Sequence, residues 1–313
     1  MILAVNPNTA IDRVLFVPRF ALGKTLRATQ SAWGMGGKAA DAAWVLGELG
    51  YHALVLGFAA GDAGRTAQAM LEARGVRVEF TWTGGETRVN TIIVDEDAGA
   101  QTTITSEGLE VAPAHVDDLR ARYAGALDAA TCVIVGGSLP PGVEPALYPE
   151  LIGQARARGA PVVFDASGPG LAAGVSAAPT VVKPNRDELE ALARRALPAL
   201  ADVLAAARDL LARGVQIVIA TMGGDGALAV MADRAYHIPP VPVRVVNAAG
   251  AGDAVLAGMA AALSEGKPVE DGLRLGFAAA AAVCLTPGTA DCRRADVERL
   301  LPQVRMIPIE HRA

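Results

Sequence analysis

From about residue 131 onward, short apolar runs rich in β-branched residues alternate with stretches of helical periodicity. The apolar runs predict strands at residues 132–135, 162–165, 180–182 and 217–221. The periodic stretches predict helices at residues 145–158, 186–192 and 201–213. This alternation is typical of a parallel sheet that helices cover on both faces. The pattern therefore predicts an α/β fold with a mostly parallel central sheet.

The first third of the chain has a different pattern, because several strand-like segments follow one another without long helices between them. These segments are residues 14–17, 78–82, 91–94 and 102–105. A helix at residues 39–49 and a strand at residues 53–57 fit the main sheet better. We therefore predict one α/β domain over residues 1–313. A small β-sheet lid is inserted in it, formed by about residues 12–33 and 78–106.

Composition supports this fold class and excludes several kinds of partner. Of the 313 residues, 52% are hydrophobic and only 4% are aromatic, which suits small side chains packed between helices and a buried sheet. The net charge of -5 provides no basic field for a nucleic acid. The longest apolar stretch, residues 277–285, is shorter than the roughly 20 residues that a membrane span needs. We expect neither nucleic acid nor membrane as a partner.

The cysteines and the amino-terminal residues indicate the compartment. The chain has 3 cysteines, too few for a disulfide framework or a zinc cluster. Cys132 and Cys284 lie in apolar runs, so we expect buried thiols. Met1 leads directly into a short strand with no basic segment and no cleavage site of the secretory type. These features predict a cytoplasmic protein.

A glycine-rich turn precedes a helix near the carboxyl terminus. Residues 243–246 predict a strand, residues 247–252 a turn of small residues, and residues 253–263 a helix. The first N–H groups of a helix lack internal partners and lie at the positive end of its dipole, so they can bind a phosphate or a developing oxyanion. Asp253 at that position can accept a proton from a hydroxyl group. Taken alone, the pattern favours a simple helix cap over catalysis.

Three motifs, together with their order along the chain, favour catalysis over a simple helix cap. Residues 250–254, Gly-Ala-Gly-Asp-Ala, followed by Ala257-Gly258, resemble the signature of the ribokinase-like (PfkB) carbohydrate kinases. Residues 36–38, Gly-Gly-Lys, and residues 185–188, with Asn first and Glu last, resemble two further motifs of that family. Segments 87–90, 136–142 and 183–185 are most similar to its hexose-phosphate branch. That branch contains 1-phosphofructokinases, tagatose-6-phosphate kinases and minor 6-phosphofructokinases.

The resemblance implies a ribokinase-like three-layer α/β/α fold and an activity. The activity is that of a phosphotransferase with an alcohol group as acceptor, which uses ATP and Mg²⁺ to phosphorylate a sugar phosphate. Fructose-1-phosphate is our first choice of acceptor. Tagatose-6-phosphate, fructose-6-phosphate and other small sugars are alternatives. The family also implies a homodimer formed through the lid.

The resemblance assigns the transfer roles residue by residue. Asp253 is the expected base, and backbone N–H groups of Gly250, Ala251 and Gly252 face the transferring phosphoryl group. The residues expected to bind the nucleotide are Lys183, Asn185, Thr221, Gly223 and Gly226. A glycine-rich hairpin turn is the structural alternative for residues 221–226.

Magnesium and the acceptor use further positions. Asn185 and Glu188 are the expected Mg²⁺ residues, and their structural alternative is a capping box. The residues expected to bind the acceptor are Asp12, Arg27, Gly37, Lys38, Asp41, Arg88 and Ser138. Among these, Arg27, Arg88 and Ser138 match positions that hold the existing phosphate of the acceptor. An arginine can bind two phosphate oxygens at once, although solvated surface charge is the default for a single arginine.

The chain departs from the family pattern at three positions. Ala39 replaces a usual glycine, Asp41 a usual asparagine, and Ala248 a usual threonine. Asparagine both donates and accepts hydrogen bonds, whereas an ionised aspartate only accepts them. An ionised Asp41 can accept hydrogen bonds from sugar hydroxyl groups but cannot donate one to a carbonyl or phosphate oxygen.

Other functions fit the sequence less well. Residues 34–39 match a dinucleotide-binding fingerprint, but no clear strand precedes them and no acidic residue follows at the required strand end. Residues 23–25, Gly-Lys-Thr, resemble the end of a Walker A loop, but Pro18 occupies the place of its first glycine. A non-catalytic sugar-phosphate sensor is a third alternative, and the retained Asp253 argues against it.

Overall fold

The computed structural model describes residues 1–309, and residues 310–313 of the predicted domain lie outside that range. Its main feature is a ten-stranded sheet with the order β16-β15-β14-β13-β12-β11-β10-β1-β4-β5. In this order, adjacent strands from β13 through β10 and β1 to β5 are parallel. The pairs β13-β14, β14-β15 and β15-β16 at the other edge are antiparallel. The prediction of a mostly parallel central sheet is confirmed. The strands are β1 (Ile2–Asn6), β4 (Ala53–Ala59), β5 (Arg77–Trp82), β10 (Cys132–Gly137), β11 (Val162–Ala166), β12 (Val181–Val182), β13 (Ile217–Thr221), β14 (Ala227–Val230), β15 (Ala235–Ile238) and β16 (Ile307–Pro308).

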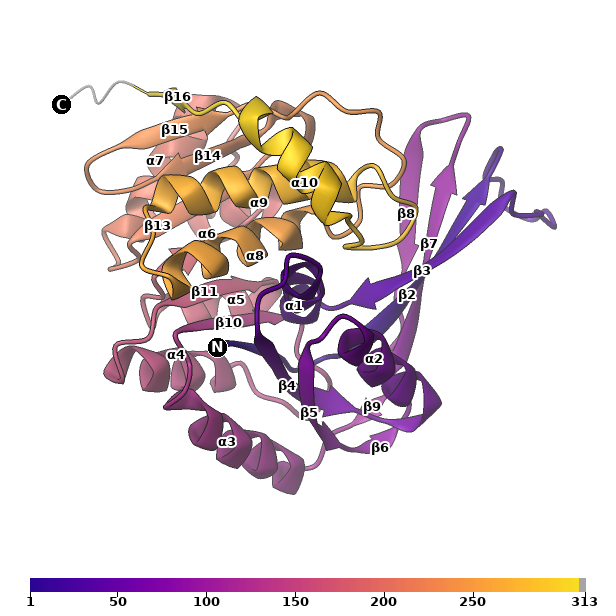
Figure 1. The fold of residues 1–313 in the computed structure, drawn as a ribbon, viewed down its shortest axis with the longest axis horizontal. Coiled ribbons are helices and arrows are strands. Elements are labelled where there is room, and N and C mark those ends of the chain that lie inside the picture. The colour runs from indigo at the N-terminus through magenta and orange to yellow at the C-terminus, as the bar shows by residue number, and fades with distance from the viewer. Residues whose placement is uncertain (310–313) are drawn as a thin grey trace.

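Helices cover both faces of this sheet (Figure 1). Alternate residues of a strand point to opposite faces, so Ile2 and Ala4 of β1 enter one apolar cluster while Leu3 and Val5 enter the other. The first cluster includes side chains of α1 (Lys38–Glu48), α2 (Gly61–Ala73), α8 (Ala251–Ser264), α9 (Val269–Val283) and α10 (Arg294–Leu300). The second includes side chains of α3 (Pro113–Leu127), α4 (Leu147–Ala157), α5 (Gly168–Val175), α6 (Arg186–Ala193) and α7 (Leu200–Leu211). The fold therefore has three layers.

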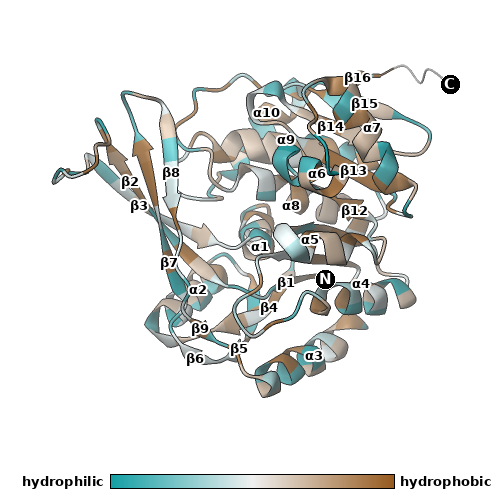
Figure 2. Cartoon of the chain, turned by 180° about the vertical axis from the view of Figure 1, so that it is seen from behind, coloured by the Kyte–Doolittle hydropathy of each residue, from teal (hydrophilic) through white to brown (hydrophobic). Residues whose placement is uncertain are grey.

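A four-stranded sheet projects from one end of the main sheet (Figure 1). Its order is β3-β2-β7-β8, from β3 (Gln30–Gly36), β2 (Ala10–Val17), β7 (Arg88–Asp95) and β8 (Ala100–Ile104). Hydrophobic stretches run along β2 and β7 (Figure 2), where Val14, Phe16 and Ile92 form a small buried cluster. We call this sheet the lid. A third sheet has two strands, β6 (Gly84–Gly85) and β9 (Leu109–Glu110). Along the chain, β6 lies between β5 and β7, and β9 follows β8.

One predicted strand lies in another sheet than expected, and another predicted strand does not form. Residues 78–82, which we assigned to the lid, belong to β5, which pairs in parallel with β4 at the edge of the main sheet. The edge position leaves β5 with one neighbouring strand and several half-exposed side chains, which imitates a lid strand in the sequence. Residues 243–246 form no strand, and the N–H of Val246 donates to the carbonyl of Cys284 in α9's carboxyl-terminal turn. The apolar pattern of this segment instead belongs to the wall of a pocket.

Smaller predictions had mixed outcomes. Cys132 is buried as expected, whereas Cys284 is only partly buried. The helix predicted at residues 253–263 begins two residues earlier, at Ala251. Short 3₁₀ turns occur at Gly223–Asp225 and Leu301–Gln303. Within residues 1–309, no helix is both long enough and apolar enough to span a bilayer.

Candidate active site

The predicted transfer residues meet where parallel strands of the main sheet end. Asp165 lies near the end of β11, Lys183 follows β12, and α6 and α8 begin close by. In open α/β sheets this edge is the usual place for a ligand, because loops and helix amino termini converge there. The lid stands over the same edge (Figure 1).

The turn before α8 requires glycine. Gly250 has a φ of 80°, in the left-handed region, and a Cβ added to it would lie 2.4 Å from the backbone nitrogen of Ala290. Asp253 is the third residue of the helix that follows. The N–H of Ala251 donates to the carbonyl of Ala248 at 3.2 Å, whereas no backbone carbonyl of the described residues accepts from the N–H of Gly250 or Gly252. Two of the three predicted N–H groups are thus free to bind an anion.

The surroundings of Asp253 suit a general base. Burial, followed by the negative charge of Asp165, raises the pKa of Asp253 to about 6. Lys183, Lys38 and a hydrogen bond with Asp41 oppose that rise. A base is most effective when its pKa lies near the working pH, so the arrangement favours proton acceptance close to neutrality.

Two lysines flank a buried carboxylate beneath Asp253. Lys38 Nζ lies 2.5 Å from Asp165 Oδ1, and Lys183 Nζ lies 2.6 Å from Asp165 Oδ2. Lys38 Nζ also donates to Glu188 Oε1 at 3.1 Å. Burial alone would lower the pKa of Lys38, but the charges of Asp165, Glu188 and Asp253 outweigh it and raise that pKa. Lys38 was predicted to bind the acceptor, and in the structure its ammonium group pairs with the carboxylates of Asp165 and Glu188.

The amino terminus of α6 is a complete capping box. The backbone N–H of Glu188 donates to Asn185 Oδ1 at 2.8 Å, and the N–H of Asn185 donates to Glu188 Oε2 at 2.9 Å. The structural alternative that the sequence left open is therefore present. The capping box does not exclude a role of Glu188 in binding Mg²⁺, because Glu188 Oε1 points away from the cap toward Lys38.

The carboxylates of Asp165 and Glu188 indicate which kind of metal site fits this region. Among residues 1–309, no group of three or more His, Cys, Asp or Glu side chains could hold a metal ion directly. Mg²⁺ commonly keeps several waters and binds one or two carboxylates together with nucleotide phosphates. Asn185, Glu188 and Asp165 provide oxygens of that kind. They fit a Mg²⁺ ion held through water and phosphate, and they do not form an all-protein cage.

The acceptor end is built by neighbouring lid strands. β2 and β7 pair in parallel with Ala10 opposite Arg88 and Asp12 opposite Asn90, which places these side chains in adjacent positions. Asn90 Nδ2 donates to Asp12 Oδ1 at 2.8 Å. Burial raises the pKa of Asp12, although the bond from Asn90 and the charge of Arg88 oppose the rise. Asp12 is thus a buried acceptor facing the end of the lid that adjoins the main sheet.

Arg88 reaches from the lid to the loop after β10. Its Nη2 lies 3.4 Å from Ser138 Oγ and 3.3 Å from the carbonyl oxygen of Asn8. Asn8 Nδ2 also donates to Ser138 Oγ, at 3.1 Å. The structure brings Arg88 and Ser138 together as the resemblance implied. Burial lowers the pKa of Arg88, and the charges of Asp12 and Asp41 partly offset this effect.

Gly37 and Asp41 begin the helix that faces the lid. Gly37 has a φ of 104°, and a Cβ there would lie 2.5 Å from the side chain of Asn6. It precedes α1 and brings that helix against the end of β1. Asp41, in the first turn of α1, is 3% exposed. Gly37, Asp41 and Asp12 therefore enclose one side of the acceptor region.

Arg27 is the predicted site residue that the structure does not bring to the others. It lies on the exposed loop between β2 and β3, beyond the strand pair Phe16 and Gln30 at the far end of the lid. Within residues 1–309, no hydrogen bond or ion pair connects Arg27 with the other predicted site residues. Its role in phosphate binding stays a prediction.

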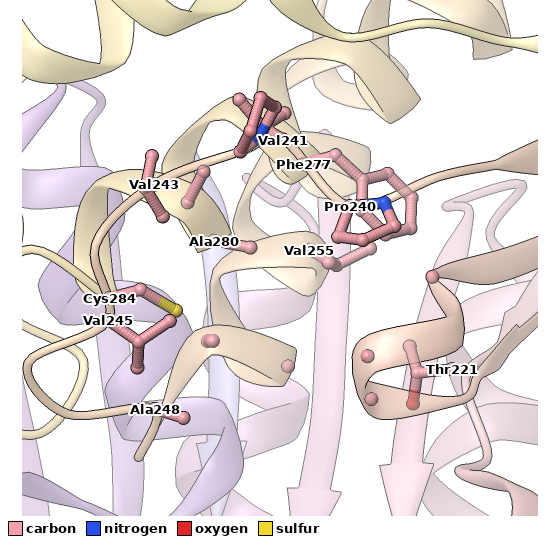
Figure 3. Close-up of a pocket in the computed structure, with 17 residues that line it drawn as sticks. Thr221, Pro240, Val241, Val243, Val245, Ala248, Val255, Phe277, Ala280 and Cys284 are labelled. Atoms are coloured by element: carbon pink, nitrogen blue, oxygen red, sulfur yellow. The ribbon is translucent and has the colours of Figure 1, made fainter. Parts of the chain in front are cut away.

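A cavity of about 550 Å³ adjoins Gly252 and Ala251 (Figure 3). Of the predicted nucleotide residues, Thr221, Gly223 and Gly226 line it, and Asn185 is linked to Thr221 by an isolated β-bridge. Figure 3 shows an otherwise apolar wall on which side chains from the segment before α8 face side chains of α8 and α9. These wall residues include Pro240, Val241, Val243, Val255, Phe277 and Ala280. A flat apolar ring fits between such walls.

Several residues of the site were not found in the sequence. Asp165 was assigned only to a strand end, although an acidic residue that closes an otherwise apolar strand is a usable signal. Asn6 lacked a clear signal, because short polar side chains beside turns are common. Asn90 lies in segment 87–90, whose resemblance was noted without a role for this residue. Residues 243–246 were interpreted as a strand. The prolines at 239, 240 and 242, which come directly before them, argue against a central strand.

The lid and the turn before α8 contact the same loop. The backbone of Thr289 lies against Gly34 in β3, where an added Cβ would be 2.4 Å from its nitrogen. The next residue, Ala290, packs against Gly250, and its N–H donates to the carbonyl of Ala249 at 3.0 Å. This loop therefore connects the position of the lid with that of the α8 turn.

Comparison with known proteins gives one consistent result. Residues 4–296 match the family described as pfkB family carbohydrate kinase. A 1-phosphofructokinase of Xanthomonas campestris pv. campestris is 36% identical over 266 residues, which cover 83% of each chain. A 1-phosphofructokinase of Haloferax volcanii is 35% identical over 96% of this chain and 95% of its own. The crystal structure of a possible 1-phosphofructokinase from Thermotoga maritima is 25% identical, covers 99% of this chain and 100% of its own, and gives a TM-score of 0.90.

Proposed function

The chain belongs to the pfkB family of carbohydrate kinases and is a phosphotransferase with an alcohol group as acceptor; we propose that it phosphorylates fructose-1-phosphate with ATP. The product is fructose-1,6-bisphosphate. The observation that carries this proposal is the placement of Asp253 between two sets of groups. On one side are Lys38, Lys183 and the apolar cavity, and on the other is Asp41, which in turn lies beside Asp12 and Arg88.

Asp253 acts as the general base. It accepts the proton of the acceptor hydroxyl while that oxygen forms a bond to the γ-phosphorus of ATP. The bond between the γ-phosphorus and the bridging oxygen breaks, and ADP leaves. Phosphoryl transfer depends mainly on alignment and charge stabilisation. The free N–H groups of Gly250 and Gly252 and the helix dipole of α8 stabilise the charge on the transferring group.

ATP binds with its base between the apolar walls of the cavity and its phosphates toward Lys183 and the α8 turn. Thr221, Gly223 and Gly226 support this orientation because they line the end of the cavity nearest β13. Gly226, with a φ of 82°, lies so close to Ile238 that a Cβ would be 2.2 Å from its carbonyl oxygen. Asn185 and Glu188 would hold Mg²⁺, which would supply positive charge to the nucleotide phosphates.

The acceptor binds between the lid and the start of α1. Asp12 and Asp41 accept or share hydrogen bonds with sugar hydroxyl groups, and Arg88 with Ser138 binds the phosphate that the sugar already carries. A homodimer through the lid is part of the proposal, supported by the exposed side chains of Trp33, Val89 and Ile104 on lid strands. A second copy would remove these apolar groups from water.

A substrate screen tests the proposal. ADP release and the phosphorus NMR spectrum of the product are measured with fructose-1-phosphate, fructose-6-phosphate, tagatose-6-phosphate and the unphosphorylated sugars. We expect the highest kcat/KM with fructose-1-phosphate. A preference for either 6-phosphate would contradict the acceptor but not the reaction class. Tight binding of a sugar phosphate without transfer from ATP would instead indicate the sensor.

A further inference from the structure

Asp41 occupies a position where an ionised carboxylate is poorly accommodated. It is 3% exposed, and no N–H or O–H group in the described part of the chain donates to its Oδ1. Its carboxyl group lies within hydrogen-bonding reach of the carboxyl group of Asp253. Two carboxylates cannot hydrogen-bond to each other unless one of them carries a proton. One of the two carboxyl groups must therefore carry a proton.

The charged groups that act on Asp41 come from three other elements and from α1 itself. Asp253 faces it from α8, Asp12 from β2 and Arg88 from β7, while Lys38 lies one turn away on α1 itself. Lys38 pairs with Asp165 and Glu188, and Lys183 pairs with Asp165, so the positive charge that acts on Asp41 is that of Arg88. A phosphorylated sugar and ATP add further negative charge to this region. An additional buried charge is strongly disfavoured under these conditions.

Resting on the proposed function, we propose that Asp41 is a positioning residue that works as a neutral carboxylic acid and donates a hydrogen bond to the Asp253 carboxylate. In this form Asp41 offers one donor and one acceptor, as an asparagine would. Asp253 stays ionised and can accept the hydroxyl proton, and the Asp41 proton is not consumed in the reaction. The aspartate at this position thereby avoids placing a second negative charge beside the transferring phosphoryl group.

The electrostatics of the two groups agree with this assignment. Burial, followed by the charges of Asp253 and Asp12, raises the pKa of Asp41 well above its usual value. The hydrogen bond from Asp41 acts in the opposite direction on Asp253 and lowers its pKa. The pair therefore holds one proton near neutrality and loses it only at higher pH.

The first test is the pH profile of kcat/KM with fructose-1-phosphate for the wild type and for Asp41→Asn, each normalised to its own maximum. Both profiles fall on the acidic side as Asp253 becomes protonated. The wild type also falls on the alkaline side, by about tenfold per pH unit, as Asp41 loses its proton. Asp41→Asn lacks this alkaline fall because its amide does not ionise. The same alkaline fall in both proteins would overturn the proposal.

A second test needs no turnover. In protein labelled with ¹³C at the aspartate carboxyl carbons, we expect one resonance with the shift of a protonated carboxyl at neutral pH. Asp41→Asn removes it, and the control Asp62→Asn, whose side chain is 93% exposed on α2, leaves it unchanged. Fully ionised aspartates in the wild type at neutral pH would overturn the proposal. Failure of the proposed function appears separately, as an absence of transfer to any sugar phosphate in the wild type.

Discussion

The proposed active site has a transfer end around Asp253 and an acceptor end between the lid and α1, and the two ends differ in how their polar groups are partnered. At the transfer end, Lys38, Lys183, Asp165 and Glu188 form ion pairs of 2.5 to 3.1 Å without any ligand. At the acceptor end, several buried polar atoms have no hydrogen-bond partner within residues 1–309. These are both side-chain polar atoms of Asn6, Thr9 Oγ1, Asp41 Oδ1, Arg88 Nε and Asn90 Oδ1. One end is organised in advance, whereas the other is left open.

This difference corresponds to two tasks. Charge stabilisation is most effective when the charged groups are already in place, since they then need no reorganisation during the reaction. Selection of an acceptor works through groups that the correct substrate satisfies, because each buried polar group left unpaired costs about 1–3 kcal/mol. We therefore expect changes at the transfer end to affect kcat or folding. Changes at the acceptor end should affect KM for the sugar phosphate.

The largest expected effect is that of Asp253→Asn at the transfer end. Loss of the base should lower kcat by about 10²-fold to 10⁴-fold, with KM for the sugar phosphate little changed. Asp271→Asn is a matched control, because Asp271 is also the third residue of its helix and its N–H also donates to a residue three positions earlier. Steady-state rates of both variants show whether Asp253 acts as a general base or only as a helix cap. Near-normal rates for Asp253→Asn would contradict the catalytic role.

The same variant has a predicted effect on stability. Because the pKa of Asp253 is raised in the fold, the folded state binds this proton more tightly than the unfolded chain, and its ionisation destabilises the fold. That loss of stability develops as pH rises from the usual aspartate value toward about 6 and is complete at neutral pH. Asp253→Asn should therefore unfold at a higher temperature than the wild type at neutral pH. A lower Tm would indicate that the residue serves mainly as a cap.

Asp165→Asn tests whether the lysine network is organised in advance. Asp165 is fully buried and neutralises both Lys38 and Lys183, so its removal leaves Lys183 without its ion-pair partner and Lys38 with Glu188 alone. Breaking such a buried pair should lower the free energy of unfolding by about 3 kcal/mol. Asp128→Asn, which breaks an exposed pair with Arg158, should change it little. Urea unfolding curves measure both, and equal midpoints for the two variants would contradict a preformed network.

The sequence could predict the elements of the transfer end better than their contacts. The turn at residues 250–253 and the start of α6 were predictable because helix caps and glycine turns depend on neighbouring residues. The pairing of Lys38 with Asp165 joins residues 127 positions apart and depends on which strands become neighbours. β5 was misassigned for a similar reason, since an edge strand and a lid strand have the same half-buried pattern. Local signals are in the sequence, whereas sheet order is set by the whole fold.

The smallest expected effect is that of Arg88→Lys at the acceptor end. Arg88 Nη2 contacts Ser138 and Asn8 while Nε is buried without a partner, so part of the guanidinium group is available to bind phosphate oxygens. Lysine retains the charge but loses the planar pair of donors, and KM for the sugar phosphate should rise about tenfold. KM for ATP and kcat should stay close to the wild type.

Arg13→Lys is the matched control for this change. Arg13 lies on β2 next to Asp12, but its side chain is exposed and its guanidinium stacks on Trp33 at 5.6 Å from the ring centre. Its substitution should leave KM for both substrates unchanged. If Arg88→Lys lowers kcat as strongly as it raises KM, the lid also contributes to phosphoryl transfer. The two ends would then act as one unit, connected through the loop at Thr289 and Ala290 that contacts both β3 and the α8 turn.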